Sequence, residues 1–180
     1  MTRFRGLEFS GSSAPIQQEL RAIEGAVGVQ LPKDFKIFLR AANGLTLPYA
    51  VYLETPELEA SLNFRHIFSV SSPSDSEESI FEQLVAIRSR WHIPREILPF
   101  AREDGSSVAC LDLRDQNYGA VVALLAPEDY PIDPARLVEP PFVQVAPSFI
   151  EYINRLVPDS PTPLLESSTT GHQRPDVLRA

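Results

Sequence analysis

The most regular hydrophobic pattern in the chain lies at residues 16–44. Its first half repeats an apolar residue every three or four positions, and this spacing predicts a helix with one apolar face that ends at Gly28. In its second half, Pro32 suits the first turn of another helix, which Asn43 and Gly44 can close. The apolar faces consist of Ile16, Leu20, Ile23, Val27, Phe35, Phe38, Leu39 and Ala42. Two short amphipathic helices of this kind must bury their apolar faces against a further layer.

Short apolar segments bounded by turn residues predict the strands of that layer. They lie at residues 49–54, 64–70, 97–101, 108–113, 120–125 and 142–146. Residues 120–125 are apolar on both faces, which indicates a central strand, and we expect them to form a hairpin with residues 108–113. On the latter strand, Ala109, Leu111 and Leu113 share one face, which we expect to lie on the helices.

Two more helices complete the pattern. One is predicted at residues 76–91, where Ser74 and Glu77 have capping-box spacing, and the other begins after Ser148. These elements predict an α+β fold, in which a mainly antiparallel sheet of about five or six strands packs against the N-terminal helix pair and the C-terminal helix. The predicted organisation is a flexible leader at 1–15, a single domain at 16–157 and a flexible Pro/Ser-rich tail at 158–180.

Charge and cysteine content narrow the classes of function. The 180 residues include 24 acidic and 16 basic ones, and a net charge of −8 disfavours nucleic acid as a partner because the protein would repel phosphates. The same charge suits a basic partner, or it serves solubility alone. A single cysteine, Cys110, excludes an internal disulfide and a multi-cysteine zinc site. No apolar run approaches the ~20 residues of a membrane span, and no signal-peptide pattern is present, so we expect a cytoplasmic protein without membrane contact.

The chain offers little material for catalysis. His66 lies in a strand pattern and His92 at a helix end, and no two histidines have the spacing of metal ligands. Cys110 lies within a predicted strand, without a cationic neighbour or a helix N-terminus to lower its pKa. We therefore expect no catalytic residue, no cofactor and no metal.

Acidic residues offer a binding surface instead. Those around the hairpin at 102–115, including Asp112 and Asp115, have the chemistry of divalent-cation ligands, but their spacing does not match an EF-hand loop and solvated turn carboxylates are the simpler interpretation. A negative patch for a protein partner requires no special spacing. Its candidate residues are Glu54, Glu57, Glu59, Asp75, Glu77, Glu78, Glu103 and Asp104. The alternative is that each acidic stretch is an ordinary solvated loop or helix start.

An ordered set of short motifs resembles the SUKH superfamily, which contains the yeast cell-wall assembly regulator and many bacterial immunity proteins. The N-terminal part of the set is IE at 23–24, LPKDF at 31–35, FL at 38–39 and NG at 43–44. The later motifs are LPFA at 98–101, DG at 104–105, CLDL at 110–113, GAVV at 119–122 and SFIEY at 148–152. They occur in the order typical of the family and span most of the predicted domain.

The resemblance implies a non-enzymatic immunity protein that binds and neutralises a cognate bacterial toxin domain, such as a nuclease. A basic toxin would complement the acidic chain. The alternative within the same superfamily is a regulatory scaffold that binds other proteins. A hydrolase using Cys110 or His66 is a third hypothesis, and it requires a pocket in which those side chains meet carboxylates.

Overall fold

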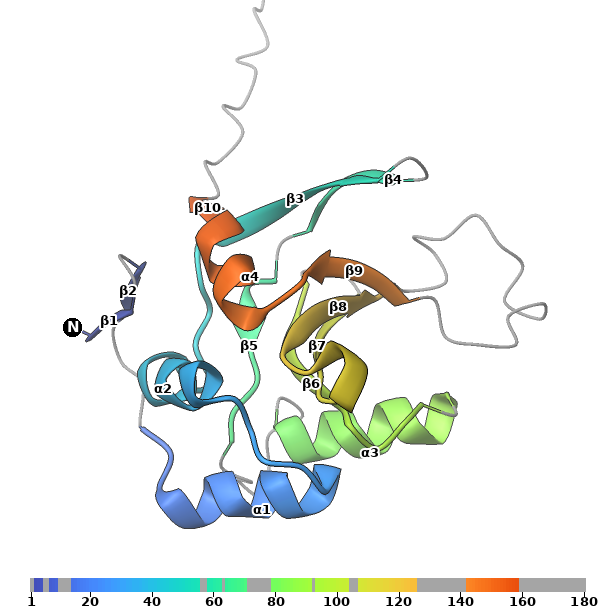
Figure 1. Ribbon diagram of the computed structural model, residues 1–180. Helices are drawn as coiled ribbons and strands as arrows, with labels where there is room; N and C mark the ends of the chain where they lie inside the picture. The colour runs from blue at the N-terminus through green and yellow to red at the C-terminus, as the bar shows by residue number, and fades with distance from the viewer. Residues whose placement is uncertain are drawn as a thin grey trace, which may run out of the picture.

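A computed structural model describes residues 2–4, 7–9, 14–55, 58–62, 64–70, 79–91, 93–103, 107–125 and 142–158. Within these ranges the chain has an α+β fold, as predicted (Figure 1). Its helices are α1 (Gln17–Val27), α2 (Lys33–Ala42), α3 (Ile80–Arg90) and α4 (Phe149–Arg155). Of the predicted tail at 158–180, Pro158 belongs to a short strand opposite Tyr49, and residues 159–180 lie outside the described residues.

The N-terminal helix pair forms as its hydrophobic pattern predicts. Helix α1 ends at Gly28, which adopts a φ of 78° and donates its N–H to the Glu24 carbonyl oxygen at 2.8 Å. A glycine takes up this left-handed conformation without the steric cost of a Cβ. Helix α2 follows Pro32 and buries Phe35 and Phe38 completely.

The main sheet has five antiparallel strands in the order β5-β6-β7-β8-β9. They are β5 (His66–Ile67), β6 (Ile97–Arg102), β7 (Val108–Asp112), β8 (Ala120–Leu124) and β9 (Phe142–Ala146). The predicted hairpin between β7 and β8 is present, with Cys110 opposite Val122. Because all five residues of β7 are buried, both faces of the sheet are covered at this strand.

Two smaller sheets accompany the main one. Strands β3 (Tyr49–Thr55), β4 (Leu58–Leu62) and β10 (Val157–Pro158) form an antiparallel sheet in the order β10-β3-β4. Near the N-terminus, β1 (Thr2–Phe4) pairs with β2 (Leu7–Phe9), so two short strands occur within residues 1–15. The sequence pattern did not predict this division into separate sheets.

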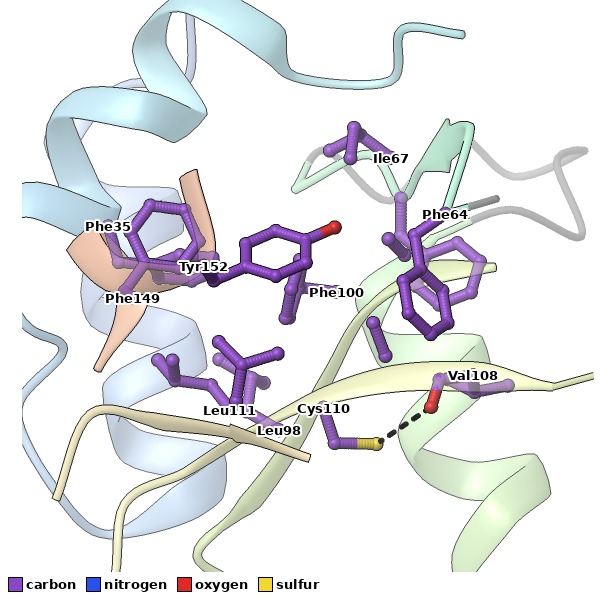
Figure 2. Packing of buried hydrophobic residues seen from close by; sticks show 14 of the residues in the cluster. Phe35, Phe64, Ile67, Leu98, Phe100, Val108, Cys110, Leu111, Phe149 and Tyr152 are labelled. Carbon is purple, nitrogen blue, oxygen red and sulfur yellow. Dashed lines mark hydrogen bonds between the residues drawn. The ribbon is translucent and has the colours of Figure 1, made fainter. Parts of the chain in front are cut away.

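An aromatic cluster joins the layers. Helix α4 contacts α2, β3, β8 and β9, and it therefore lies between the three-stranded sheet and the main sheet (Figure 1). The ring centroid of Phe149 on α4 lies 5.0 Å from that of Phe35, 5.1 Å from that of Phe38 and 5.9 Å from that of Phe100. Figure 2 shows Phe35, Phe100, Phe149 and Tyr152 gathered at the centre of the core. On the other side of the main sheet, α3 packs along β6.

Two predicted elements are shorter than the sequence indicated. Helix α3 begins after Ser79, whose hydroxyl accepts a hydrogen bond from the Glu82 N–H at 3.2 Å, and not near residue 76 after Ser74. Strand β5 occupies two residues of the predicted 64–70, although the Phe68 N–H still donates to the Phe100 carbonyl oxygen of β6 at 2.9 Å. Beyond it, the Val70 N–H binds the Asn43 side chain at 2.7 Å.

Candidate protein-binding surface

The structure describes part of the predicted acidic patch. Glu57, Asp75, Glu77, Glu78 and Asp104 lie outside the described residues. Glu54 on β3 is directly opposite Glu59 on β4, so the hairpin brings these two positions together. Glu103 follows the end of β6, is half-buried, and donates its N–H to the Ser107 carbonyl oxygen at 3.0 Å. A continuous negative patch stays a prediction. The structure places two of its positions, Glu54 and Glu59, next to each other on one hairpin.

Cys110 has the environment of a structural residue. Its side chain is completely buried in the main sheet, and its Sγ lies 3.9 Å from the Val108 carbonyl oxygen (Figure 2). Burial raises the pKa of the Cys110 thiol far above its ordinary value, because a thiolate would lose its hydration. The thiol therefore stays protonated at neutral pH and lacks the reactivity that a nucleophile requires.

Among the described residues, the histidine and the carboxylates add no candidate catalytic or metal-binding group. His66 pairs with Arg102 in the sheet, and its Nδ1 lies 3.2 Å from the Thr46 hydroxyl. His92 and His172 lie outside the described residues. The described residues contain no group of three or more metal-ligating side chains. None of the helices described has the length and apolar character needed to cross a membrane.

The expectation that the carboxylates of this hairpin are solvated is wrong for Asp112. It is completely buried at the end of β7, and both of its carboxylate oxygens accept hydrogen bonds. Arg114 donates from Nη2 at 2.6 Å, from Nε at 3.0 Å and from its backbone N–H at 3.1 Å, and Asn117 donates from Nδ2 at 3.1 Å. Burial alone would raise the pKa of Asp112, but these hydrogen bonds outweigh it and hold the pKa below its ordinary value.

The Asp112 interactions fix a turn that presents an aromatic ring to solvent. The turn contains the 3₁₀ helix η1 (Asp115–Asn117) and ends at Gly119, whose φ is 90°. Tyr118 retains 46% of its exposure, and its hydroxyl donates to the Gln30 carbonyl oxygen at 2.8 Å. Exposed tyrosines on rigid loops are common contacts in protein interfaces, because little side-chain entropy is lost on binding.

The α1–α2 connection beside Tyr118 is held by one carboxylate. An oxygen of Glu24 accepts from the Leu31 N–H at 3.0 Å and from Lys36 Nζ at 3.0 Å. Burial opposes ionisation of Glu24, but these two partners lower its pKa below the ordinary value. The residues around Tyr118 are therefore anchored both to the β7–β8 hairpin and to the helix pair, which makes this part of the surface rigid.

A second surface feature lies beyond the C-terminus of α3, and we name it the arginine hollow. It is an open depression of about 510 Å³ lined by Arg88, Trp91, Ile93, Pro94 and Arg95. The Arg95 side chain extends to the end of α1, where its Nε donates to the Val27 carbonyl oxygen at 3.1 Å. Sequence reasoning missed this site, although three arginines close to the single tryptophan of an acidic chain were a usable signal.

Comparison with known proteins tests the family assignment. No curated protein shows significant similarity to the chain. The model of the SMI1 / KNR4 family (SUKH-1) matches residues 15–155. This match covers both helices of the N-terminal pair, the main sheet and α4, and it agrees with the motif order found in the sequence. The chain therefore belongs to the SMI1 / KNR4 family of the SUKH superfamily.

Proposed function

We propose that the protein is a non-enzymatic immunity protein, which neutralises a cognate bacterial toxin domain by stoichiometric binding. The observation that carries this proposal is the family match at residues 15–155, since the family includes toxin immunity proteins as well as cell-wall regulators. The buried, protonated thiol of Cys110 supports a binding role over a catalytic one.

The charge of the chain supports a basic toxin. At a net charge of −8 the protein attracts a basic partner and repels nucleic acid. Two of the acidic candidates, Glu54 and Glu59, occupy opposite positions of the β3–β4 hairpin. Complementary charge of this kind raises the association rate and fixes the orientation of the partners more than it adds affinity.

The second candidate function is a regulatory scaffold of the cell-wall assembly regulator type. The observation in its favour is the same family match, because that family also contains regulators. A scaffold would bind several signalling or wall-synthesis proteins, whereas an immunity protein would bind one toxin domain. The identity of the partners therefore separates the two functions.

Affinity purification of the tagged protein from its native cells, at low and at high salt, tests the proposal. A single stoichiometric basic toxin domain, retained less well as salt rises, is the expected result. Co-expression with a toxic domain encoded in a neighbouring gene should restore growth. Several wall-synthesis or signalling proteins would favour the scaffold, and a protein that neither binds nor protects would overturn the immunity proposal.

A matched pair of variants tests the acidic surface. Reversing the charge of both hairpin positions, with Glu54→Lys and Glu59→Lys, should slow association with a basic toxin and weaken its salt dependence. Glu151→Lys reverses one charge at an exposed position of α4 and is compared with each hairpin substitution made singly, so that the change in net charge is the same. Equal association rates for the hairpin variant and the unmodified protein would show that this hairpin does not face the toxin.

A further inference from the structure

The arginine hollow has a charge opposite to that of the whole chain. Arg88 and Arg95 line it, and the guanidinium carbon of Arg90 lies 5.7 Å from the ring centroid of Trp91. The two nearest acidic residues in the described sequence do not line the hollow: Glu82 closes the capping box with Ser79, and Glu96 is one of the charges that raise the pKa of Arg114. A cationic surface of this kind, on a protein of net charge −8, favours an anionic ligand at one specific place.

The two arginines of the hollow are oriented by backbone carbonyls. Arg95 donates from Nε to Val27 and from Nη2 to Gly25, at 3.1 and 3.5 Å, and Arg88 donates from Nη2 to the Arg95 carbonyl oxygen at 2.8 Å. A guanidinium group has five N–H donors, so both side chains keep donors beyond these bonds. The Arg88 Nε is buried and has no hydrogen-bond partner among the described residues. Spare donors on oriented guanidinium groups match the two oxygens of a carboxylate.

The rest of the lining is apolar. Ile93 is buried, Pro94 is exposed and Trp91 is half-buried, with its backbone N–H bound to the Ile87 carbonyl oxygen at 2.8 Å. The volume of about 510 Å³ falls within the range of ligand sites, roughly 300–1,000 Å³. Tryptophan and arginine are also the residue types that most often dominate the energy of protein interfaces. The hollow therefore suits a carboxylate that is attached next to an apolar group.

We propose that the arginine hollow binds an acidic segment of a partner protein, in which a glutamate or aspartate is adjacent to a large apolar side chain. The carboxylate meets Arg88 and Arg95, and the apolar side chain rests on Trp91 and Ile93. A long polyanion such as nucleic acid is disfavoured, because the rest of the acidic surface repels it. This inference concerns residues other than those of the predicted acidic patch and holds for a toxin or for any other protein partner.

Trp91 is the only tryptophan of the chain and lines the hollow, so fluorescence excited at wavelengths that the five tyrosines absorb little reports on this site. The probe is the peptide acetyl-Leu-Glu-Leu-Glu-Leu-amide, titrated into the full-length protein, with the matching peptide that carries Gln in place of Glu as the control. The Glu peptide should produce a saturable change in fluorescence and bind at least tenfold more tightly than the Gln peptide. Its affinity should fall as salt is added.

Variants locate the binding within the hollow. Arg88→Gln and Arg95→Gln should each weaken the Glu peptide at least tenfold, while Arg40→Gln, an exposed arginine on α2, should leave binding unchanged. Because Arg95 also supports the end of α1, thermal unfolding of each variant must accompany its titration. Where a variant does not fold, the comparison of Glu and Gln peptides on the unmodified protein still decides the question.

Three results would overturn the proposal. These are no saturable signal with the Glu peptide, equal affinity for the Glu and Gln peptides, and unchanged binding in folded Arg88→Gln and Arg95→Gln. Inorganic phosphate is titrated in parallel. Saturation by phosphate without any by the Glu peptide would assign the hollow to a phosphorylated ligand and would equally overturn an acidic protein segment.

Discussion

Asp112 and Arg114 form an ion pair at 2.6 Å in which the carboxylate is completely buried and the guanidinium group is partly exposed. The pair joins two residues separated by a single position, so it stabilises a local turn and not a contact between distant elements. With Asn117 as a further donor, it holds the β7–β8 connection in one conformation and presents Tyr118 beside the helix pair. Rigidity at this surface therefore depends on a carboxylate that must remain ionised.

Replacing Asp112 by Asn tests that dependence. Because its pKa is lowered in the folded protein, the carboxylate stabilises the fold at pH values above its unfolded pKa of about 3.9, and the stabilisation is lost as pH falls through the lower folded value. Asp112→Asn should reduce the free energy of unfolding at pH 7 by about 1–3 kcal/mol and should flatten its decline in acid. Urea unfolding at several pH values measures both effects.

Asp115→Asn provides the control for this prediction, since Asp115 lies in the same turn and is exposed. We expect a change within about 0.5 kcal/mol for that variant. An Asp112→Asn protein as stable as the unmodified one at neutral pH would contradict the role given to the ion pair.

Gly25 within α1 and Gly28 just after it should respond in opposite directions to replacement by alanine. Gly28 has a φ of 78°, and a Cβ there would collide with the guanidinium group of Arg95. Gly28→Ala should cost about 1–3 kcal/mol, through left-handed strain and displacement of Arg95 from the Val27 carbonyl oxygen. At Gly25 a Cβ meets nothing within 4 Å, so Gly25→Ala should stabilise the helix by about 0.5–1 kcal/mol. Thermal unfolding distinguishes the two, and equal shifts would contradict the placement of Arg95.

The aromatic cluster predicts a large effect of Phe35. Its side chain is completely buried, with ring centroids of Phe100 and Phe149 at 5.5 and 5.0 Å. Phe35→Ala should cost about 3–5 kcal/mol, measured by denaturant unfolding, because it removes apolar contacts and leaves a cavity. Ile37 on the same helix is 41% exposed, and Ile37→Ala should change stability by less than about 1 kcal/mol. A loss well under 1 kcal/mol at Phe35 would disprove its place in the core.

Cys110 should be inert in the native protein. Burial raises the pKa of its thiol, so iodoacetamide at mildly alkaline pH should label it only in concentrated guanidinium chloride. Cys110→Ser should preserve any protective or binding activity in protein that still folds. Rapid labelling under native conditions, or loss of activity in a folded Cys110→Ser variant, would reopen the catalytic hypothesis.

Sequence reasoning succeeded where one local pattern decided the structure. The apolar spacing in α1 predicts its buried face, and the glycine that follows predicts where the helix ends. The β7–β8 hairpin follows from two apolar strands with a short turn between them. It failed where two local solutions were equivalent. Ser74 with Glu77 and Ser79 with Glu82 have the same capping-box spacing, and helix α3 begins at the second pair, followed by the fully buried Ile80.

The candidate surfaces show a similar limit. Acidic residues are visible in any sequence, but whether they lie together depends on how distant loops are placed. Among the described residues, the structure puts Glu54 opposite Glu59, a pairing that the sequence pattern did not predict. The arginine hollow requires Arg95 to reach Val27, a residue 68 positions earlier in the chain. No local periodicity encodes that contact, because it arises from the packing of whole elements. Asp112 was misjudged for the same reason, since its burial depends on the sheet around it.

The position of Phe149 has a consequence for the growing polypeptide. The core rings that it contacts, Phe35 and Phe38, are translated more than one hundred residues earlier. At ~5–20 residues per second, the ribosome takes several seconds or more to produce the residue that covers them. During that interval the α2 phenylalanines lack one of their partners, and a nascent chain in this state offers apolar surface to chaperones. Translation speed between these segments is therefore a variable on which the yield of folded protein depends.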